Sequence, residues 1–340
     1  MEPPAPRQAS LAGLPRAAAA VEPLGDVVAG TVAVGEARVV AVVAEDVVRL
    51  KLWAAFAALC IVWGTTWVPA RTLAETVPPL RGTVARFALA GLLCIPVILW
   101  KRLELPRGRQ LGFVFLLSFT LVALPVLLLF WAQPRLSSAT VTVLFAAMPL
   151  LLVILDPKIV PHSALQACIV ALGAIAVVVS LRFSVDQAGG AAVVLLDVMS
   201  TAGSLLLVRR ELRRIHPVVI TALLLGPAAL LLFLSSLLFE PGQTVEWNRN
   251  AITSVIFLAV LGGAPAYATY FWLLERLEPY QVATLQWVEP LIALWESALL
   301  LHIGLSFTMF AGSLVTLFCV FWVMRARVED DDPVSLHGNS

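Results

Sequence analysis

The chain has 340 residues, of which 60% are hydrophobic and only 13% charged, and its formal net charge is +1. Its mean hydropathy is +0.92. Soluble domains carry about 25% charged residues, because a surface that faces water needs them. This composition excludes a water-soluble globule and makes lipid the main solvent for the side chains. With a net charge near zero and no basic face, nucleic acid is not an expected partner.

The first 50 residues lack an apolar run of membrane length. Residues 1–25 are rich in proline and alanine, and residues 26–48 mix valine, alanine and glycine with scattered acidic side chains. This composition predicts a disordered cytoplasmic tail. A second interpretation is that translation starts later, near Val48, where a short basic segment precedes the first apolar run.

From Lys51 to Met324 the chain is a series of apolar runs of about 20 residues, the length that a helix needs to cross the hydrocarbon core. We predict an all-α membrane protein, with an acidic cytoplasmic tail at 326–340. The ten predicted transmembrane helices are 52–70, 82–100, 111–131, 136–155, 163–181, 190–208, 217–239, 251–274, 279–301 and 305–324.

The two halves of the membrane region repeat each other. The repeated residues include Trp, Gly and Pro, which are less easily matched by chance than Leu in a Leu-rich chain. An offset of 141 pairs Phe130-Trp131 with Phe271-Trp272 and Pro149-Leu150 with Pro290-Leu291, and an offset of 139 pairs Gly64 with Gly203 and Pro78 with Pro217. Such duplication is typical of transporters built from two repeats. We place the repeats at 51–182 and 189–325, with five helices in each.

Positive charge predicts the orientation. Fifteen Arg and Lys residues lie in loops on the side of the N-terminus, and five lie on the opposite side. Because basic loops stay in the cytoplasm, we expect a multi-pass protein of the cell membrane with both termini cytoplasmic. Five helices in each half then give the two repeats opposite orientations.

Prolines interrupt two predicted helix hairpins at matching places. Such helix breaks are tolerated where protein or a water-filled cavity surrounds them. The helix-break prolines are Pro125, Pro149, Pro265 and Pro290.

Several short motifs occur in a characteristic order: Trp63-Gly64-Thr65-Thr66-Trp67, Pro78-Pro79-Leu80, Ala85-Arg86-Phe87 and Ala90-Gly91. Over about 51–325 the chain resembles the EamA-type transporters of the drug/metabolite transporter superfamily. The resemblance implies ten helices in two inverted five-helix repeats. It also implies movement of small metabolites, commonly amino acids or related compounds and often outward. One departure is that His162 and Ile303 stand where the family often has Glu.

Ionisable groups at membrane depth are costly and therefore mark candidate functional residues. Glu289 shares one helical face with Gln286 and Glu296, whereas their counterparts in the first half are apolar. This predicts a half-polar, half-apolar cavity for an amphipathic solute. Glu289 fits two roles, proton coupling and binding of a substrate ammonium group. The structural alternative is that it accepts N–H groups freed by Pro290 or pairs with Arg86.

Three further charged residues have open roles. Arg86 is suited to pair with an acidic group or a substrate carboxylate, or to a structural role in helix pairing. Asp197 is suited to pair with Arg86 or with a substrate amine. Glu296, nearer the outer end of its helix, fits a vestibule or a packing role.

Aromatic residues are the remaining candidates. Trp63, Trp67 and Trp287 lie near the middle of their helices and are placed to stack on a planar or cationic solute. Tyr267 and Tyr270 are weaker candidates of the same kind.

No phosphate-binding loop, GxSxG or HExxH motif occurs in the sequence, so we predict no enzyme activity, cofactor or metal. The leading interpretation is a secondary transporter that works by alternating access and moves its substrate outward. Its expected partners are a small-molecule substrate, protons and the lipid bilayer, with a homodimer left open. The alternative is a non-transporting membrane protein: a lipid scramblase, an intramembrane enzyme or a sensor.

Overall fold

The computed structural model describes residues 46–136, 138–156, 162–178, 187–300 and 307–325. Every regular element in these ranges is helical, so the fold is all-α. The chain divides into a unit that ends at Lys51 and a second unit from Leu52 to Ser340; the packing below is that of the second. The predicted tails before residue 46 and after residue 325 lie outside the described residues.

A first helix at 46–65 begins inside the predicted tail. The helical elements that follow it are α2 (Trp67–Ala74), α3 (Pro79–Trp100), α4 (Arg109–Leu117), η1 (Ser118–Ala123), α5 (Leu124–Ala132), η2 (Gln133–Arg135), α6 (Ser138–Ala146), α7 (Met148–Leu155), α8 (His162–Val178), α9 (Ala188–Glu211), α10 (Pro217–Phe239), α11 (Arg249–Val260), α12 (Ala264–Leu274), α13 (Pro279–Val282), α14 (Leu285–Leu300) and α15 (Phe307–Arg325).

Many of these helices have membrane length. Within the described ranges, seven helical stretches are long and apolar enough to cross a bilayer, and two shorter apolar helices accompany them. Large apolar side chains point outward: Leu238 on α10 is 75% exposed and Phe307 on α15 is 83% exposed. Water would disfavour such surfaces and lipid does not. The chain is therefore a multi-pass membrane protein.

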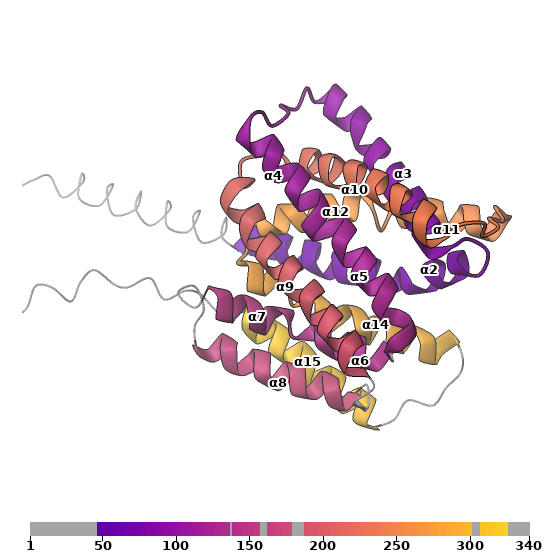
Figure 1. The fold of residues 1–340 in the computed structure, drawn as a ribbon. Helices are drawn as coiled ribbons and strands as arrows, with labels where there is room; N and C mark the ends of the chain where they lie inside the picture. Colours follow the sequence, from indigo (N-terminus) through magenta and orange to yellow (C-terminus); the bar gives the residue numbers. More distant parts are fainter. Residues whose placement is uncertain (1–45, 137, 157–161, 179–186, 301–306, 326–340) are drawn as a thin grey trace, which may run out of the picture. The chain divides into compact units, whose positions relative to one another are not determined.

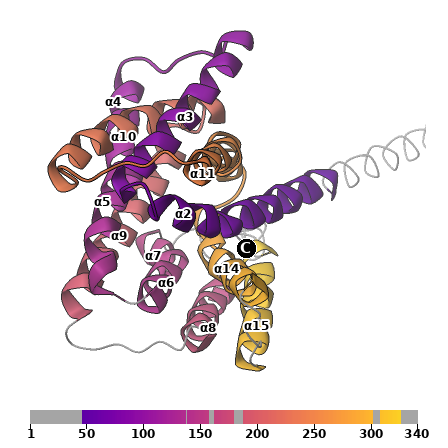
Figure 2. The same ribbon diagram turned by 90° about the vertical axis from the view of Figure 1, so that its right-hand side faces the viewer.

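Helices at matching positions in the two halves pack against each other. α3 lies along α10, and α8 lies along α15 (Figures 1 and 2). In the first pair the backbones approach closely, since a Cβ on Gly91 would lie 3.5 Å from the nitrogen of Gly226. In the second, a Cβ on Gly312 would lie 2.1 Å from a methyl group of Val178. Small residues permit this close packing of membrane helices.

Several predicted spans are broken, and most of the breaks lie beside a proline. Pro149 follows the break between α6 and α7, and Pro265 follows the break between α11 and α12; each lies in the first turn of its helix. The first turn tolerates proline because its N–H groups have no intrahelical partner. Pro290 differs: it lies inside α14, and the break comes earlier, between α13 and α14.

Pro125 follows η1, a π-helical segment. Here the N–H of Leu124 donates to the carbonyl of Phe119, five residues back, instead of to Thr120. The next residue, Pro125, has no N–H to donate. The Thr120 carbonyl thus loses both of its usual donors, and it accepts a hydrogen bond from Ser200 Oγ of α9 at 2.8 Å. A local break in α-helical bonding therefore becomes a contact between two helices.

A side chain at the end of α10 holds the N-terminus of α3. The fully buried Glu240 accepts hydrogen bonds from the N–H groups of Leu80, at 2.8 Å, and Arg81, at 3.2 Å. The Arg81 guanidinium in turn donates to the carbonyls of Glu240, at 2.9 Å, and Gln243, at 2.8 Å. A carboxylate stabilises a helix N-terminus by satisfying its free N–H groups and its dipole. Glu240 and Arg81 together hold the N-terminal end of α3, the helix that carries Arg86.

Candidate functional site

Three aromatic residues selected from the sequence meet in the interior. The ring of Trp63, on the first helix, lies 5.4 Å from Tyr267 and 5.2 Å from Tyr270 on α12, measured between ring centroids. Phe87 of α3 packs edge-on against Tyr267 at 6.1 Å. We call Trp63, Phe87, Tyr267 and Tyr270 the aromatic group. It joins side chains from three separate membrane segments.

Two ionisable side chains of opposite type lie near enough to the aromatic group to interact with it. Glu289 of α14 interacts electrostatically with both Tyr267 and Tyr270, and Arg86 of α3 interacts with Tyr267. The guanidinium carbon of Arg86 lies 4.8 Å from the centre of the Phe87 ring. Tyr267 is thus the side chain that the positive and the negative group share.

Both charged groups have a buried atom without a hydrogen-bond partner: Arg86 Nε and Glu289 Oε1. Among the described residues, no ion pair within 4.0 Å joins them, and no backbone N–H near Pro290 donates to the carboxylate. The structural alternative for Glu289, capping of freed N–H groups or pairing with Arg86, is therefore not seen. An unsatisfied buried polar atom is unfavourable, and membrane charges of this kind mark functional sites.

Helix breaks and close contacts position this site. The indole N–H of Trp63 donates to the carbonyl of Gly262, at the break between α11 and α12, at 3.1 Å. A Cβ on Gly64 would lie 2.6 Å from Ile292 of α14, and a Cβ on Gly263 would lie 2.6 Å from Ala90 of α3. The first helix, α3, α12 and α14 therefore converge where Glu289 and Arg86 lie.

Asp197 belongs to a different polar cluster, on α9. It is 1% exposed; its Oδ1 accepts a hydrogen bond from Thr201 at 3.2 Å, and its Oδ2 has no partner. Ser200 and Ser204, on the same helical face, both bond to Thr120 of η1, the latter at 2.8 Å. No ion pair links Asp197 to Arg86 in the described part of the chain.

Three other candidates from the sequence take separate positions. Trp287 is fully buried, and its indole N–H donates to the carbonyl of Ala146 at 2.7 Å, which accounts for it as a packing residue. Trp67 on α2 is 52% exposed. Gln286 is half-buried on α14, one turn before Glu289.

Glu296 lines a cavity between α14 and α15 with a volume of about 410 Å³. Its Oε2 is buried without a partner, and the neighbouring Trp295 donates to Ser313 of α15 at 3.2 Å. The residues around the cavity are Val288, Leu291, Ile292, Trp295, Glu296, Ser313 and Leu317. Glu289 is not among them, so the two carboxyl groups of α14 have different surroundings.

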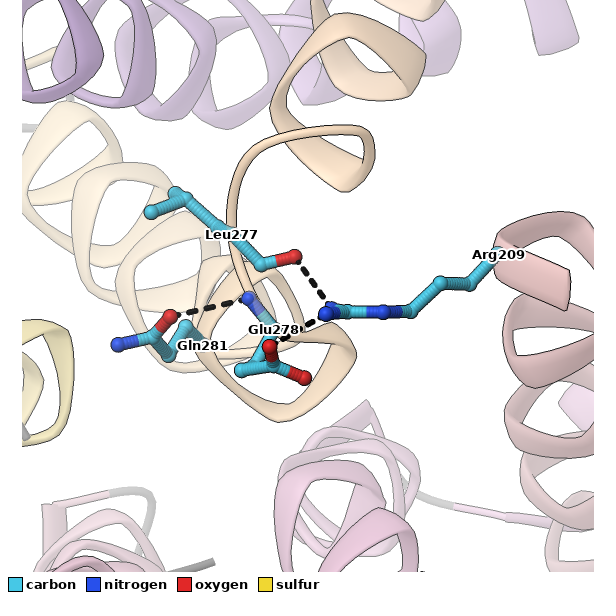
Figure 3. A network of polar contacts seen from close by, with 4 residues as sticks. All are labelled: Arg209, Leu277, Glu278 and Gln281. Carbon is cyan, nitrogen blue, oxygen red and sulfur yellow. Dashed lines mark hydrogen bonds and ion pairs between the residues drawn. The ribbon is translucent and has the colours of Figure 1, made fainter. Parts of the chain in front are cut away.

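A network at the other end of the molecule was not anticipated from the sequence (Figure 3). Arg209 of α9 forms an ion pair with Glu278 and donates to the carbonyl of Leu277 at 2.8 Å. Gln281 accepts from the N–H of Glu278 at 3.0 Å and donates to the carbonyl of Val323 at 3.1 Å. The network thus links α9, α13 and α15. Its one sequence signal is the spacing of Glu278 and Gln281, which suits a helix cap.

The described ranges contain no group of three or more His, Cys, Asp or Glu side chains placed to hold a metal ion. His162, at the place where the family often has Glu, begins α8 and is exposed. Ile303 lies outside the described residues.

Several known proteins resemble the chain in sequence, and a solved structure resembles it in fold. Protein PecM of Dickeya dadantii is 28% identical over 264 residues, which cover 76% of this chain and 86% of PecM. Protein PagO of Salmonella typhimurium is 25% identical, covering 70% and 81%. The uncharacterized inner membrane transporter YedA of Escherichia coli is 26% identical, covering 72% and 81%. One solved crystal structure superposes with a TM-score of 0.69 at 16% identity and covers 80% of this chain and 96% of that chain.

The family comparison covers most of the membrane region. The EamA-like transporter family matches the chain twice, at residues 51–182 and 188–325. This confirms the resemblance that the short motifs carry. The chain belongs to the EamA-like transporter family of the drug/metabolite transporter superfamily, and it is a multi-pass membrane transporter.

Proposed function

We propose that the chain is a secondary transporter of the cell membrane that moves small zwitterionic solutes, such as amino acids with apolar side chains, outward. The observation that carries the proposal is the pair of unsatisfied atoms, Arg86 Nε and Glu289 Oε1, in two residues that both interact electrostatically with the same aromatic residue, Tyr267. A solute with one carboxylate and one ammonium group would satisfy both at once. Its apolar part would lie against the aromatic group. We assign no catalytic step to the chain.

Each side chain then has a separate role in binding. Glu289 would accept hydrogen bonds from the ammonium group, and Arg86 would donate to the carboxylate; charge-assisted hydrogen bonds of this kind are stronger than neutral ones. The rings of Trp63 and Tyr270 add attraction for a cation, as aromatic cages do for ammonium ligands. Gln286, one turn from Glu289, supplies a further polar group.

We propose that ten transmembrane helices form two inverted five-helix repeats with both termini in the cytoplasm. Contacts between counterparts support this arrangement: α3 with α10, α8 with α15, and Trp287 with Ala146, whose numbers differ by the repeat offset of 141. When two halves are related by a two-fold axis, a residue meets its own counterpart only near that axis.

Alternating access is supported by the interrupted helices at the proposed site. The aromatic group lies beside the break between α11 and α12, and Glu289 follows the break between α13 and α14. In transporters with inverted repeats, discontinuous helices surround the substrate near the middle of the bilayer, and one repeat moves against the other.

The proposal is tested by measuring ligand binding to the purified protein. Leucine should raise the thermal stability, because a ligand that binds only the folded state stabilises it by RT ln(1 + [L]/Kd). Its amine and its acid analogue, each lacking one charge, should stabilise far less. Glu289→Gln should weaken the leucine response by roughly ten-fold to a hundred-fold in Kd, the loss expected for one charged hydrogen bond.

Glu296→Gln is the matched control, since it removes a carboxyl group two turns along the same helix, outside the aromatic group. It should bind leucine like the wild type. Equal stabilisation by leucine and by its amine analogue would exclude Arg86 as a carboxylate partner. A response to phospholipid but to no zwitterion would favour the lipid-acting alternative.

A further inference from the structure

Asp197 is a buried carboxyl group that the proposed substrate site does not use. It lies near the middle of α9, is 1% exposed, and receives a single hydrogen bond, from Thr201. Its Oδ2 has no partner. The matching position in the first repeat, at the offset of 139, is Ala58. The carboxyl group is therefore a feature of one half only and is not required by the repeat architecture.

Among the described residues, no positive charge is found to compensate Asp197. α9 packs against α4, η1, α5, α6, α7 and α13, and of these only α4 and α13 carry ionisable residues, Arg109 and Tyr280. Arg109 pairs with Glu211 at 3.3 Å, and Tyr280 interacts with Arg209. Both contacts are at the C-terminal end of α9, 12 to 14 residues from Asp197 and thus about 18–21 Å along the helix.

An ionised Asp197 would be a buried charge with one hydrogen bond and no counter-ion, which is strongly unfavourable. A protonated carboxyl group carries no such charge. Na⁺ is a poorer match, because hard cations take about six oxygen ligands, and Thr201 is the one hydroxyl that contacts the carboxyl group in the described structure. The surroundings therefore suit a proton better than a metal cation.

We propose that Asp197 is the proton-binding site that couples transport to a proton gradient, protonated in the conformation described here and separate from the substrate site at Glu289. The proposal rests on the proposed function, in that it assigns the coupling ion of the same transport cycle.

The hydroxyl groups near Asp197 link its protonation state to the contact between α9 and η1. Ser200 and Thr201 follow Asp197 by one turn, and Ser200 and Ser204 hold η1 through Thr120. When the proton leaves, the carboxylate attracts hydroxyl donors, and Ser200 lies one turn away on the same helical face with its hydroxyl bonded to Thr120. Rotation of Ser200 toward Asp197 would release the Thr120 carbonyl, which has no other donor within η1. Proton release thereby loosens the contact between α9 and the π-helical segment.

The test uses the full chain in proteoliposomes that contain a pH-sensitive dye, with radiolabelled leucine as the probe. Because an inward proton gradient drives outward transport only by exchange, the wild type should move protons in the direction opposite to leucine and should accumulate leucine in response to a pH gradient. Asp197→Asn, which is neutral and of the same shape, should exchange internal for external leucine but lose both proton movement and gradient-driven accumulation. Asp197→Glu should retain coupling, and Glu296→Gln should behave as the wild type.

Leucine-dependent proton movement in Asp197→Asn equal to that of the wild type would overturn the proposal, as would accumulation driven by Na⁺ and not by protons. If Asp197→Asn does not fold, infrared difference spectra of the wild type decide. A protonated carboxyl band that disappears at high pH and shifts in Asp197→Glu supports the proposal, and its absence overturns it. Failure of the wild type to bind or exchange leucine would contradict the proposed function, while the infrared result would still decide on Asp197.

Discussion

Gly64 and Gly203 occupy matching positions in the two halves of the chain, yet their surroundings differ. A Cβ on Gly64 would lie 2.6 Å from the Cβ and from a methyl group of Ile292, whereas nothing lies within 4 Å of a Cβ built on Gly203. Backbone and Cβ atoms cannot rotate away as the end of a long side chain can. The first glycine is therefore required by a close helix contact at the substrate site, and the second is not.

We expect Gly64→Ala to lower the free energy of unfolding by about 1–3 kcal/mol, as overpacking does. Gly203→Ala should be neutral or stabilising by roughly 0.5–1 kcal/mol, because alanine favours a helix over glycine. Thermal unfolding in detergent measures both. Ile292→Ala in the Gly64→Ala background should restore part of the loss. Equal destabilisation by the two alanine variants would show that the Gly64 contact has no special role.

For single residues, the sequence indicates which side chains are unusual but says less about which residues they contact. Glu289 and Arg86 stand out because charges at membrane depth are rare, and both interact electrostatically with Tyr267. Helical periodicity also placed Glu296 on the face of Glu289, but the contact with α15 gives it a separate cavity. Trp287 could not be recognised as a packing residue, since its partner is 141 positions away.

Among the elements, α3 depends on a distant cap. Its own N-cap, Pro78, makes no side-chain hydrogen bond, and Glu240 of α10 satisfies the first N–H groups instead. Glu240→Ala leaves two N–H groups without an acceptor, so we expect a loss of about 1–3 kcal/mol in the free energy of unfolding. Thermal unfolding checks this. Glu246→Ala, in the same loop but exposed and without a side-chain hydrogen bond in the described structure, should have no effect; similar losses in both variants would refute the capping role.

Helix positions were largely predictable because apolar length alone specifies them. The predicted range 217–239 coincides with α10. The breaks were not predictable to the residue, since they depend on where freed carbonyls find donors. The Thr120 carbonyl accepts a hydrogen bond from Ser200, and the Gly262 carbonyl accepts one from Trp63. Each donor comes from another helix, so local sequence patterns locate the proline but not the partner that stabilises the break.

For the molecule as a whole, the network of Arg209, Glu278 and Gln281 holds three helices together at one end. In the proposed orientation this end faces the cytoplasm. If alternating access opens this end, the ion pair stabilises its closed form, and its removal shifts the equilibrium toward the open form.

A cysteine at position 283, where Ala283 is 3% exposed, should report this opening. We expect Arg209→Gln to raise its labelling rate by a water-soluble maleimide about five-fold to ten-fold, the effect of roughly 1–1.4 kcal/mol on a two-state equilibrium. Arg276→Gln is the control, because Arg276 pairs with its direct neighbour Glu275 and links no separate elements. Equal labelling in the two variants would show that the network does not restrain this end.

The hydrogen bond from Trp287 to Ala146 joins one of the largest fully buried side chains to the backbone carbonyl of a residue with one of the smallest. Under the proposed two-fold relation these two residues are counterparts that meet near the axis. Two identical, separate subunits would have to place the same residue on both sides of the axis. Two tryptophans would then overlap in the space that one indole fills, and two alanines would leave that space empty. A single chain that contains both halves is free of that constraint. Covalent fusion thus permits unlike residues to fill the centre, where a symmetric dimer could only match like with like.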